Sequence, residues 1–291
     1  MKIGIGLPNT VPGTTGAQLT EWARRADGAG FSTLGTVDRI AYPNIEPLIA
    51  LAAAAAVTER IGLATSILIA PYRENATIIA KQAASVHHIS GGRMTLGIAV
   101  GGRADDYAVA GVDFDSRGGE NFEAMLARIR SVWSGSHASS GAPEHEGVGP
   151  NVAPSPPDLI VGGSIDAAFR RAAEYGDGWI MGGGTPDAFV ESKAKLEHAW
   201  QGAGREGAPR TLGLGYFALG DEAAASSDAY LRDYYAFLGG AAEMVASSAA
   251  KDADTVKAYI AGFEQAGCDE FLLFPGSPDP EQVDRLAEVA L

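Results

Sequence analysis

The sequence contains a single cysteine, Cys268, and therefore no disulfide scaffold and no cysteine-based zinc or redox motif. Basic residues are also scarce: 22 Lys and Arg stand against 36 Asp and Glu, which gives a formal net charge of −14 at pH 7. A chain this acidic repels nucleic acids and anionic membranes, so we expect neither as a partner. The low cysteine content is typical of a reducing compartment, and we expect the protein to be cytoplasmic.

Long hydrophobic runs and the common catalytic motifs are also missing. The apolar run 48–57 is too short to cross a bilayer, and residues 1–9 lack the apolar stretch of a secretory signal. The sequence has no Walker loop, no GxSxG elbow and no HExxH motif. Of the five histidines, His87 and His88 are adjacent on a predicted helix, so their side chains point about 100° apart and cannot share one metal ion. We expect no metal site.

What the sequence does contain is a regular alternation of strand and helix patterns. Predicted strands lie at 2–7, 31–37, 61–69, 94–100, 158–161, 178–181, 211–219 and 270–274. Predicted helices lie at 16–29, 45–57, 75–89, 119–133, 165–175, 186–203, 253–266 and 279–290. Strands that alternate with helices form parallel sheets, so the pattern favours an α/β protein with a closed (β/α)8 TIM barrel.

The rival architecture is an open, doubly wound sheet. Such a sheet usually shows a GxGxxG turn after its first strand, whereas here residues 4–9 lack the third glycine and contain Pro8. We expect one barrel domain over residues 1–291 with insertions in the loops at its C-terminal face. Two stretches are longer than ordinary connections, at about 135–157 and 220–250, and we interpret them as excursions from that domain.

Candidate site residues come from the ends of the predicted strands, because TIM barrels carry their chemistry at the C-terminal ends of strands. Asp38 follows the second strand, Thr65 and Ser66 end the third, and Arg73 comes shortly after it. Gly101 follows the fourth strand. Each has a plainer explanation: Asp38 as a helix cap or an ion-pair partner of the adjacent arginine, Ser66 as filler in a buried strand, and Arg73 as half of a surface salt bridge.

Glycine-rich turns follow the fifth and sixth strands, and each opens a helix. They are Gly162-Gly163-Ser164 and Gly182-Gly183-Gly184-Thr185. Backbone N–H groups at a helix start bind phosphate, and glycine allows the anion to approach closely. The alternative is that these glycines only make tight turns; two such turns on adjacent strands favour a phosphate site.

Several segments together resemble one known family. They are 61–67 (IGLATSI), 70–73 (APYR), 90–97 (SGGRMTLG), 111–114 (GVDF), 162–164 (GGS) and 175–179 (YGDGW). In this combination the sequence resembles the bacterial-luciferase-like flavin-dependent oxidoreductases, the luciferase-like monooxygenase family. The resemblance extends over nearly the whole chain and is weakest over 135–157 and 205–250.

The resemblance implies a barrel that holds FMN, or the deazaflavin F420, at its C-terminal face. The phosphate would lie at Gly162, Gly163 and Ser164, assisted by the turn with Gly182, Gly183 and Thr185. The isoalloxazine ring would lie near Thr65, Ser66, Ile67 and Gly101, where several relatives have a non-proline cis peptide bond. Asp38 would face the ring edge or the substrate. Several F420-dependent relatives have histidine directly after this aspartate, and Arg39 stands here instead, which favours FMN.

The function we expect is therefore an FMN-dependent monooxygenase, which inserts oxygen from a C4a-hydroperoxyflavin into a small organic substrate. Asp38 and Arg73 are the candidate catalytic residues. The expected partners are the substrate, oxygen and a separate flavin reductase. The alternatives are an F420-dependent hydride-transfer oxidoreductase and a flavin-binding protein without turnover. We also expect a homodimer through the second and third predicted helices, because residues 46–57 are apolar on nearly every face.

Overall fold

The computed structural model of the protein describes residues 1–135, 148–152 and 154–291. Within these residues, nine strands form one sheet in the order β3-β2-β1-β9-β8-β7-β6-β5-β4, with a further pairing of β3 to β5 that closes it. Every pairing is parallel. The strands are β1 (Lys2–Gly6), β2 (Thr33–Thr36), β3 (Gly62–Thr65), β4 (Leu68–Ile69), β5 (Met94–Ala99), β6 (Asp158–Gly162), β7 (Gly178–Met181), β8 (Arg210–Phe217) and β9 (Glu270–Pro275).

The strands β3 and β4 are two halves of one barrel strand, so the nine strands make an eight-stranded barrel. The predicted TIM barrel is confirmed. Ala64 pairs with Thr95 and Leu68 with Ile98, so the split strand advances four residues (68 − 64) while β5 advances three (98 − 95). One extra residue therefore bulges out between the two halves. The Ser66-Ile67 peptide bond within this bulge is cis.

The bulge fits because its neighbour in β5 has no side chain. A Cβ on Gly97 would lie 2.1 Å from the Thr65 carbonyl oxygen, closer than any real contact allows. The Thr65 hydroxyl in turn donates a hydrogen bond of 2.6 Å to the Gly97 carbonyl. The bulge is thus fixed from both strands.

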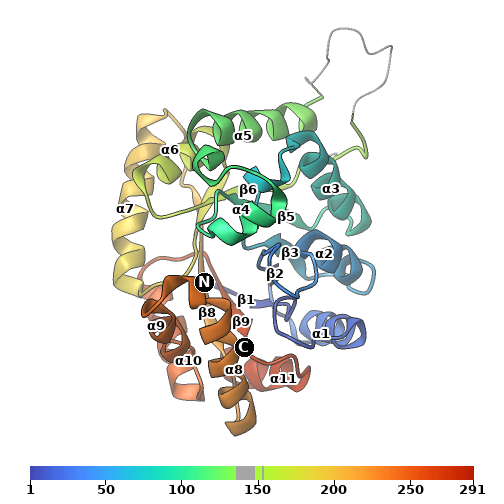
Figure 1. The fold of residues 1–291 in the computed structure, drawn as a ribbon, viewed down its shortest axis with the longest axis vertical. Coiled ribbons are helices and arrows are strands. Elements are labelled where there is room, and N and C mark those ends of the chain that lie inside the picture. Colours follow the sequence, from blue (N-terminus) through green and yellow to red (C-terminus); the bar gives the residue numbers. More distant parts are fainter. Residues whose placement is uncertain (136–147, 153) are drawn as a thin grey trace.

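Helices surround the strands in a closed ring (Figure 1). In the order of their contacts around the barrel they are α1 (Gly16–Ala29), α2 (Pro47–Ala55), α3 (Ala76–Ile89), α5 (Gly119–Trp133), α6 (Asp166–Tyr175), α7 (Pro186–Gly202), α10 (Ala253–Gln265) and α11 (Glu281–Ala290). The remaining elements are α4 (Ala104–Ala110), α8 (Asp221–Tyr234), α9 (Ala241–Ser247) and the short 3-10 turns η1 (Pro71–Arg73), η2 (Phe114–Arg117) and η3 (Ala236–Leu238).

The predicted helices match these bounds to within about two residues, because their ends carry recognisable signals. Thr15 caps α1 in a capping box with Gln18, Asn75 caps α3, and Thr185 caps α7 with proline at its first turn. The sequence pattern missed α4, which has only seven residues and follows the paired glycines after β5. A helix this short shows too few apolar positions for its period to stand out.

The interior of the barrel is filled by alternate side chains of the strands. Leu212, Leu214 and Tyr216 of β8 and Leu272 and Phe274 of β9 belong to one buried cluster. The Phe274 ring lies against β1 and β2, where a Cβ on Gly6 or Gly35 would come within 2.2 Å or 2.7 Å of it. The same cluster includes Tyr230, Leu231 and Tyr234 of α8, so the inserted helix is packed onto the barrel core.

The two long excursions lie at different ends of the barrel. Segment 220–250 follows β8 and contains α8, η3 and α9, which lie across the C-terminal ends of the strands (Figure 1). Segment 135–157 instead joins α5 to the start of β6, so its described parts belong to the opposite end, and the expectation of an insertion at the C-terminal face is wrong for this segment. Residues 136–147 and 153 of that segment lie outside the described residues. No helix in the described parts of the chain is long and apolar enough to span a bilayer.

Candidate functional site at the C-terminal end of the barrel

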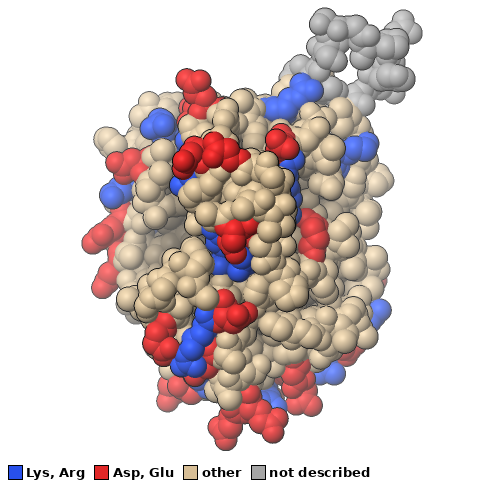
Figure 2. All heavy atoms as spheres, viewed as in Figure 1, with Lys and Arg blue, Asp and Glu red and all other residues tan. Residues whose placement is uncertain are grey.

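A cavity of about 250 Å³ opens at the C-terminal ends of the strands. Its walls come from the loop after β2, the bulge with β4 and η1, the loop after β5 with α4, the turn after β7, β8 and the α8–η3 segment. They are Val37, Asp38, Ser66, Ile67, Ile69, Tyr72, Gly101, Gly102, Arg103, Asp106, Tyr107, Gly182, Leu214, Tyr234, Tyr235 and Phe237. On this face of the molecule, acidic and basic side chains meet near the centre, between α4 and the α8–α9 segment (Figure 2).

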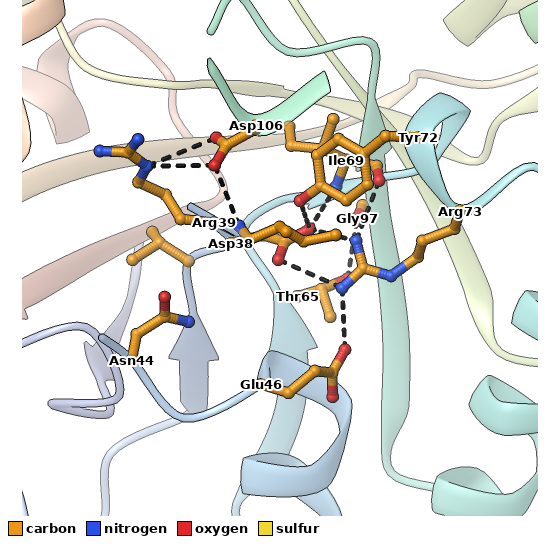
Figure 3. Close-up of polar contacts among 12 residues, drawn as sticks. Asp38, Arg39, Asn44, Glu46, Thr65, Ile69, Tyr72, Arg73, Gly97 and Asp106 are labelled. Carbon is orange, nitrogen blue, oxygen red and sulfur yellow. Dashed lines mark hydrogen bonds and ion pairs between the residues drawn. The ribbon is translucent and has the colours of Figure 1, made fainter. Parts of the chain in front are cut away.

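The carboxylate of Asp38 is the centre of a buried network on the cavity wall (Figure 3). Its side chain is fully buried and forms a two-bond ion pair with Arg73, at 2.6 Å and 3.2 Å. It also accepts hydrogen bonds from the Tyr72 hydroxyl (2.7 Å) and the Ile69 N–H (2.8 Å). Arg73 reaches further to Glu46 at 2.8 Å. Asp38 therefore ties β2, β4 and η1 together.

Burial and the neighbouring charges act in opposite directions on the groups of this network. Burial raises the pKa of the Asp38 carboxyl above its ordinary value, and the Arg73 charge and the donated hydrogen bonds oppose that rise. Burial alone would lower the pKa of Arg73, but Asp38 beside it raises that pKa above its ordinary value. Burial and the neighbouring Asp38 also raise the pKa of Tyr72, so its hydroxyl stays a donor.

Arg39 does not pair with its sequence neighbour Asp38. Its guanidinium forms ion pairs with Asp105 and, at 3.4 Å, with Asp106 at the start of α4 (Figure 3). Asp106 also accepts hydrogen bonds from the N–H groups of Ile40 (3.0 Å) and Ala41 (2.7 Å). This second network joins the loop after β2 to the loop after β5.

The bulge contains a buried polar atom without a hydrogen-bond partner. The hydroxyl oxygen of Ser66 is buried and has no hydrogen-bond partner, although its residue lines the cavity. Thr65, also predicted as a cofactor contact, instead uses its hydroxyl to fix the bulge and is absent from the cavity lining.

The predicted phosphate turn after β6 lies next to the bulge. Gly162 is packed so closely that a Cβ there would be 3.1 Å from the Ile67 side chain. Gly163 has φ of +133° and its carbonyl accepts a 2.6 Å hydrogen bond from the buried Trp179 indole. Gly163 and Ser164 are exposed, and no side chain caps the start of α6 that follows them. The start of α6 therefore has no side-chain cap and follows an exposed turn, as a phosphate site requires.

The turn after β7 differs from the turn after β6. Thr185 caps α7 itself by accepting a hydrogen bond of 3.3 Å from the Ala188 N–H. Gly182 lines the first cavity and, with Gly183, a second cavity of about 270 Å³. The second cavity extends beneath α9 and is walled mainly by Tyr216, Tyr235, Leu238, Val245, Tyr259, Phe263 and Phe271. This turn thus separates two neighbouring spaces, and its helix start already has a cap.

The structure therefore brings together some of the predicted site residues and sets others apart. Asp38, Ser66, Ile67, Gly101 and Gly182 line one cavity. Arg73 holds Asp38 from behind and lines a separate surface recess. Among the described residues, no three His, Cys, Asp or Glu side chains converge in a way that could hold a metal ion; His137 and His145 lie outside them.

Sequence reasoning missed the residues that narrow the cavity mouth. They are Arg103 and Tyr107 near α4, and Tyr234, Tyr235 and Phe237 at the end of α8 and in η3. Arg103 could have been found, because it directly follows the Gly101-Gly102 strand end. The three aromatic residues were visible as a cluster in the 220–250 insert, but the sequence did not show which of them face the cavity.

Comparisons with known proteins identify the family of this chain. A family model described as luciferase-like monooxygenase matches residues 1–290. An uncharacterized protein of Mycobacterium tuberculosis is 30% identical over 208 residues, which are 63% of this chain and 71% of that protein.

Two solved structures have the same fold over nearly their full length. An F420-dependent secondary alcohol dehydrogenase in complex with an F420-acetone adduct has a TM-score of 0.78 and 19% identity, covering 99% of this chain and 97% of that one. The oxygenating constituent of a Pseudomonas putida 3,6-diketocamphane monooxygenase, in complex with FMN, has a TM-score of 0.71 and 16% identity, covering 99% and 94%. At these identities the likeness shows the fold alone.

Proposed function

Because the chain belongs to the luciferase-like monooxygenase family and is therefore an oxidoreductase, we propose that it is an FMN-dependent monooxygenase acting on a small organic substrate. The observation that carries the proposal is the cavity at the C-terminal ends of the strands, which is lined by Ser66 and Ile67 of the bulge. Reduced FMN, delivered by a separate flavin reductase, supplies the two electrons with which one oxygen atom enters the substrate and the other leaves as water.

The chain's own residues would bind and orient the cofactor and exclude water. Ser66 would satisfy its hydroxyl on the ring system, while Ile67 and Gly101 would flank it. The Asp38–Arg73 pair would hold Ile69 and the bulge in place through the hydrogen bond to the Ile69 N–H. Tyr235 and Phe237 would cover the reacting space with apolar surface, which protects an oxygen-reactive centre from solvent.

FMN is favoured over F420 by the residues around Asp38. The position after Asp38 is Arg39, and its guanidinium is engaged by Asp105 and Asp106. The described histidines, His87, His88 and His198, lie on the outer helices α3 and α7 and do not line the cavity. Neither Arg39 nor any histidine of the described residues is therefore available as a proton donor at the ring edge.

Ligand titration tests the cofactor assignment. The apo-protein should bind FMN at least about tenfold more tightly than riboflavin, because only FMN offers a phosphate to the start of α6. Ser164→Asp should weaken FMN about 10- to 100-fold and leave riboflavin unchanged, since the added carboxylate repels the phosphate. This exposed position avoids the strain that any side chain would meet at the positive φ of Gly163.

Fluorescence quenching of each ligand measures these affinities, and Ser226→Asp on the exposed side of α8 is the matched control. Equal affinity for FMN and riboflavin would remove the phosphate site from the proposal. Tighter binding of F420 than of FMN would replace the monooxygenase with a deazaflavin-dependent hydride transfer. Oxygen consumption with reduced FMN then separates an enzyme from a flavin carrier.

We further propose that the protein forms a homodimer through α2 and α3. Ile49 on α2 and Ile78 on α3 are 63% and 54% exposed, although both are large and apolar. Light scattering should give about twice the 30.0 kDa chain mass. The double variant Ile49→Glu, Ile78→Glu should shift the measured mass to that of a single chain. Met244→Glu on α9, at a side chain that is 72% exposed, should not change the mass. A single-chain mass across a wide concentration range would contradict the dimer.

A further inference from the structure

Arg103 is held in a fixed position at the mouth of the first cavity. Its guanidinium carbon lies 4.1 Å from the centre of the Phe237 ring, 4.4 Å from that of Tyr234 and 5.2 Å from that of Tyr235. One of its N–H groups donates to the Tyr234 carbonyl oxygen. Stacking on aromatic rings orients a guanidinium while leaving its edge, with most of its five N–H donors, open to other acceptors.

The positive charge of Arg103 is unpaired within the described residues, whereas the carboxylates that line the same cavity are engaged. Asp38 is bound by Arg73, and Asp106 by Arg39 and two backbone N–H groups. No ion pair joins Arg103 to any carboxylate in the described ranges, in a chain with 36 acidic residues. The cavity therefore presents one fixed, half-buried cation beside an apolar and aromatic wall.

We propose that Arg103 binds a carboxylate group of the substrate, so that the substrate is a small monocarboxylate with an apolar or aromatic body. This inference rests on the proposed monooxygenase function and assigns the substrate class to its site. The planar guanidinium edge matches a carboxylate with two parallel hydrogen bonds. The body of the substrate then lies against Tyr235 and Leu214, which line both cavities.

A monoanion fits this wall better than a phosphate ester does. Asp38 and Asp106 are already paired with Arg73 and Arg39, so Arg103 is the one lining cation of the described residues left to offset ligand charge, and a dianion would keep one negative charge unpaired. The cofactor phosphate has its own place at the start of α6, on the turn that holds Gly163 and Ser164, and neither residue lines the cavity of Arg103. The substrate and cofactor anions are thus assigned to different elements.

Equilibrium affinities for acids and their amides test the proposal without enzyme turnover. Isothermal titration calorimetry is run on the apo-protein and on the FMN-loaded protein with benzoate, phenylacetate, indole-3-acetate and octanoate, each against its own amide. At least one acid should bind about 10- to 100-fold more tightly than its amide, the range expected for a charge-assisted pair. Arg103→Met, which keeps the apolar contact with the rings, should remove that preference, and Arg103→Lys should retain part of it.

The matched control is Arg205→Met. Arg205 is also stacked on an aromatic ring, with its guanidinium carbon 4.1 Å from the centre of the Trp200 ring, but it lies after α7, away from the cavity. Arg205→Met should leave the affinities for both the acids and the amides unchanged.

Three results would overturn the inference. The first is that no acid binds the wild type more tightly than its amide. The second is that Arg103→Met weakens acids and amides equally, which would make Arg103 a shape-determining residue. The third is that Arg103→Met weakens FMN by more than about tenfold, which would assign it to the cofactor. If the wild type did not bind FMN, the proposed function would be contradicted. The preference of the apo-protein for acids over amides is measured without FMN, so it tests the role of Arg103 separately.

Discussion

Replacing Arg73 with methionine should lower the free energy of unfolding by about 3–5 kcal/mol near neutral pH, the cost of stranding a buried charge. The Asp38 side chain is fully buried and receives two of its four hydrogen bonds from Arg73, whose side chain is only 14% exposed. Without the guanidinium, the carboxylate keeps only the Tyr72 hydroxyl and the Ile69 N–H. Urea unfolding followed by circular dichroism measures the loss.

The pH dependence of that loss identifies its cause. Burial already raises the pKa of Asp38, and removal of Arg73 takes away the charge that opposes this rise. A carboxyl whose folded-state pKa lies above its unfolded-state pKa binds its proton more tightly in the folded protein, so folding is penalised increasingly as the pH rises between the two values. The destabilisation of Arg73→Met should therefore be small at acid pH, below the unfolded-state pKa of aspartate, and grow toward neutral pH.

A double variant and a surface control complete the test. Asp38→Asn combined with Arg73→Met removes the buried charge together with its partner, so it should be more stable than Arg73→Met alone and should lose the pH dependence. Arg25→Met, which breaks an exposed ion pair with Asp284, should change stability little. A double variant no more stable than the single one would show that the buried charge is not the cause.

Replacing residues 236–247 with a short Gly-Ser linker should make hydrogen peroxide appear about tenfold faster after FMN-loaded, reduced protein meets oxygen. The segment carries η3 and α9, and it supplies Phe237 to the first cavity and Leu238 and Val245 to the second. Removing this apolar cover admits water to the reacting centre, and the oxygen is then lost as peroxide. FMN affinity should stay within about threefold, because Ser66, Gly163 and Ser164 are untouched.

Two point variants within the segment grade the effect. Phe237→Ala should give an intermediate rise in peroxide release, since one ring of the cavity wall is lost. Met244→Ala, on a side chain that is 72% exposed, should behave as the wild type. A coupled peroxide assay under stopped-flow mixing follows the release. An unchanged rate of peroxide release in the shortened protein would mean that residues 236–247 do not protect the reacting centre. The insert would then serve only to pack α8, through Tyr230 and Tyr234, against the barrel core.

The order of strands and helices was determined by the sequence itself, because each signal there is local. Strand runs, helical spacing and caps such as Thr15 and Thr185 act within a few residues, and the helix predicted at 119–133 has those same bounds in the structure. The closed barrel follows from that order, since parallel strands joined by helices have few ways to pair. The strand-end rule then selected Asp38, Ser66, Gly101 and Gly182, and in the structure these residues line one cavity.

Pairing across the barrel, by contrast, was decided only by the tertiary structure. Asp38 binds Arg73, 35 positions away, and not the adjacent Arg39, because β2 and η1 meet at the bulge while Arg39 is drawn to α4. Arg103 reaches Tyr234 across 131 positions for the same kind of reason. Ion pairing and ring stacking depend on separation in space, and a linear sequence with 22 cations and 36 anions allows far too many combinations for spacing to choose among them.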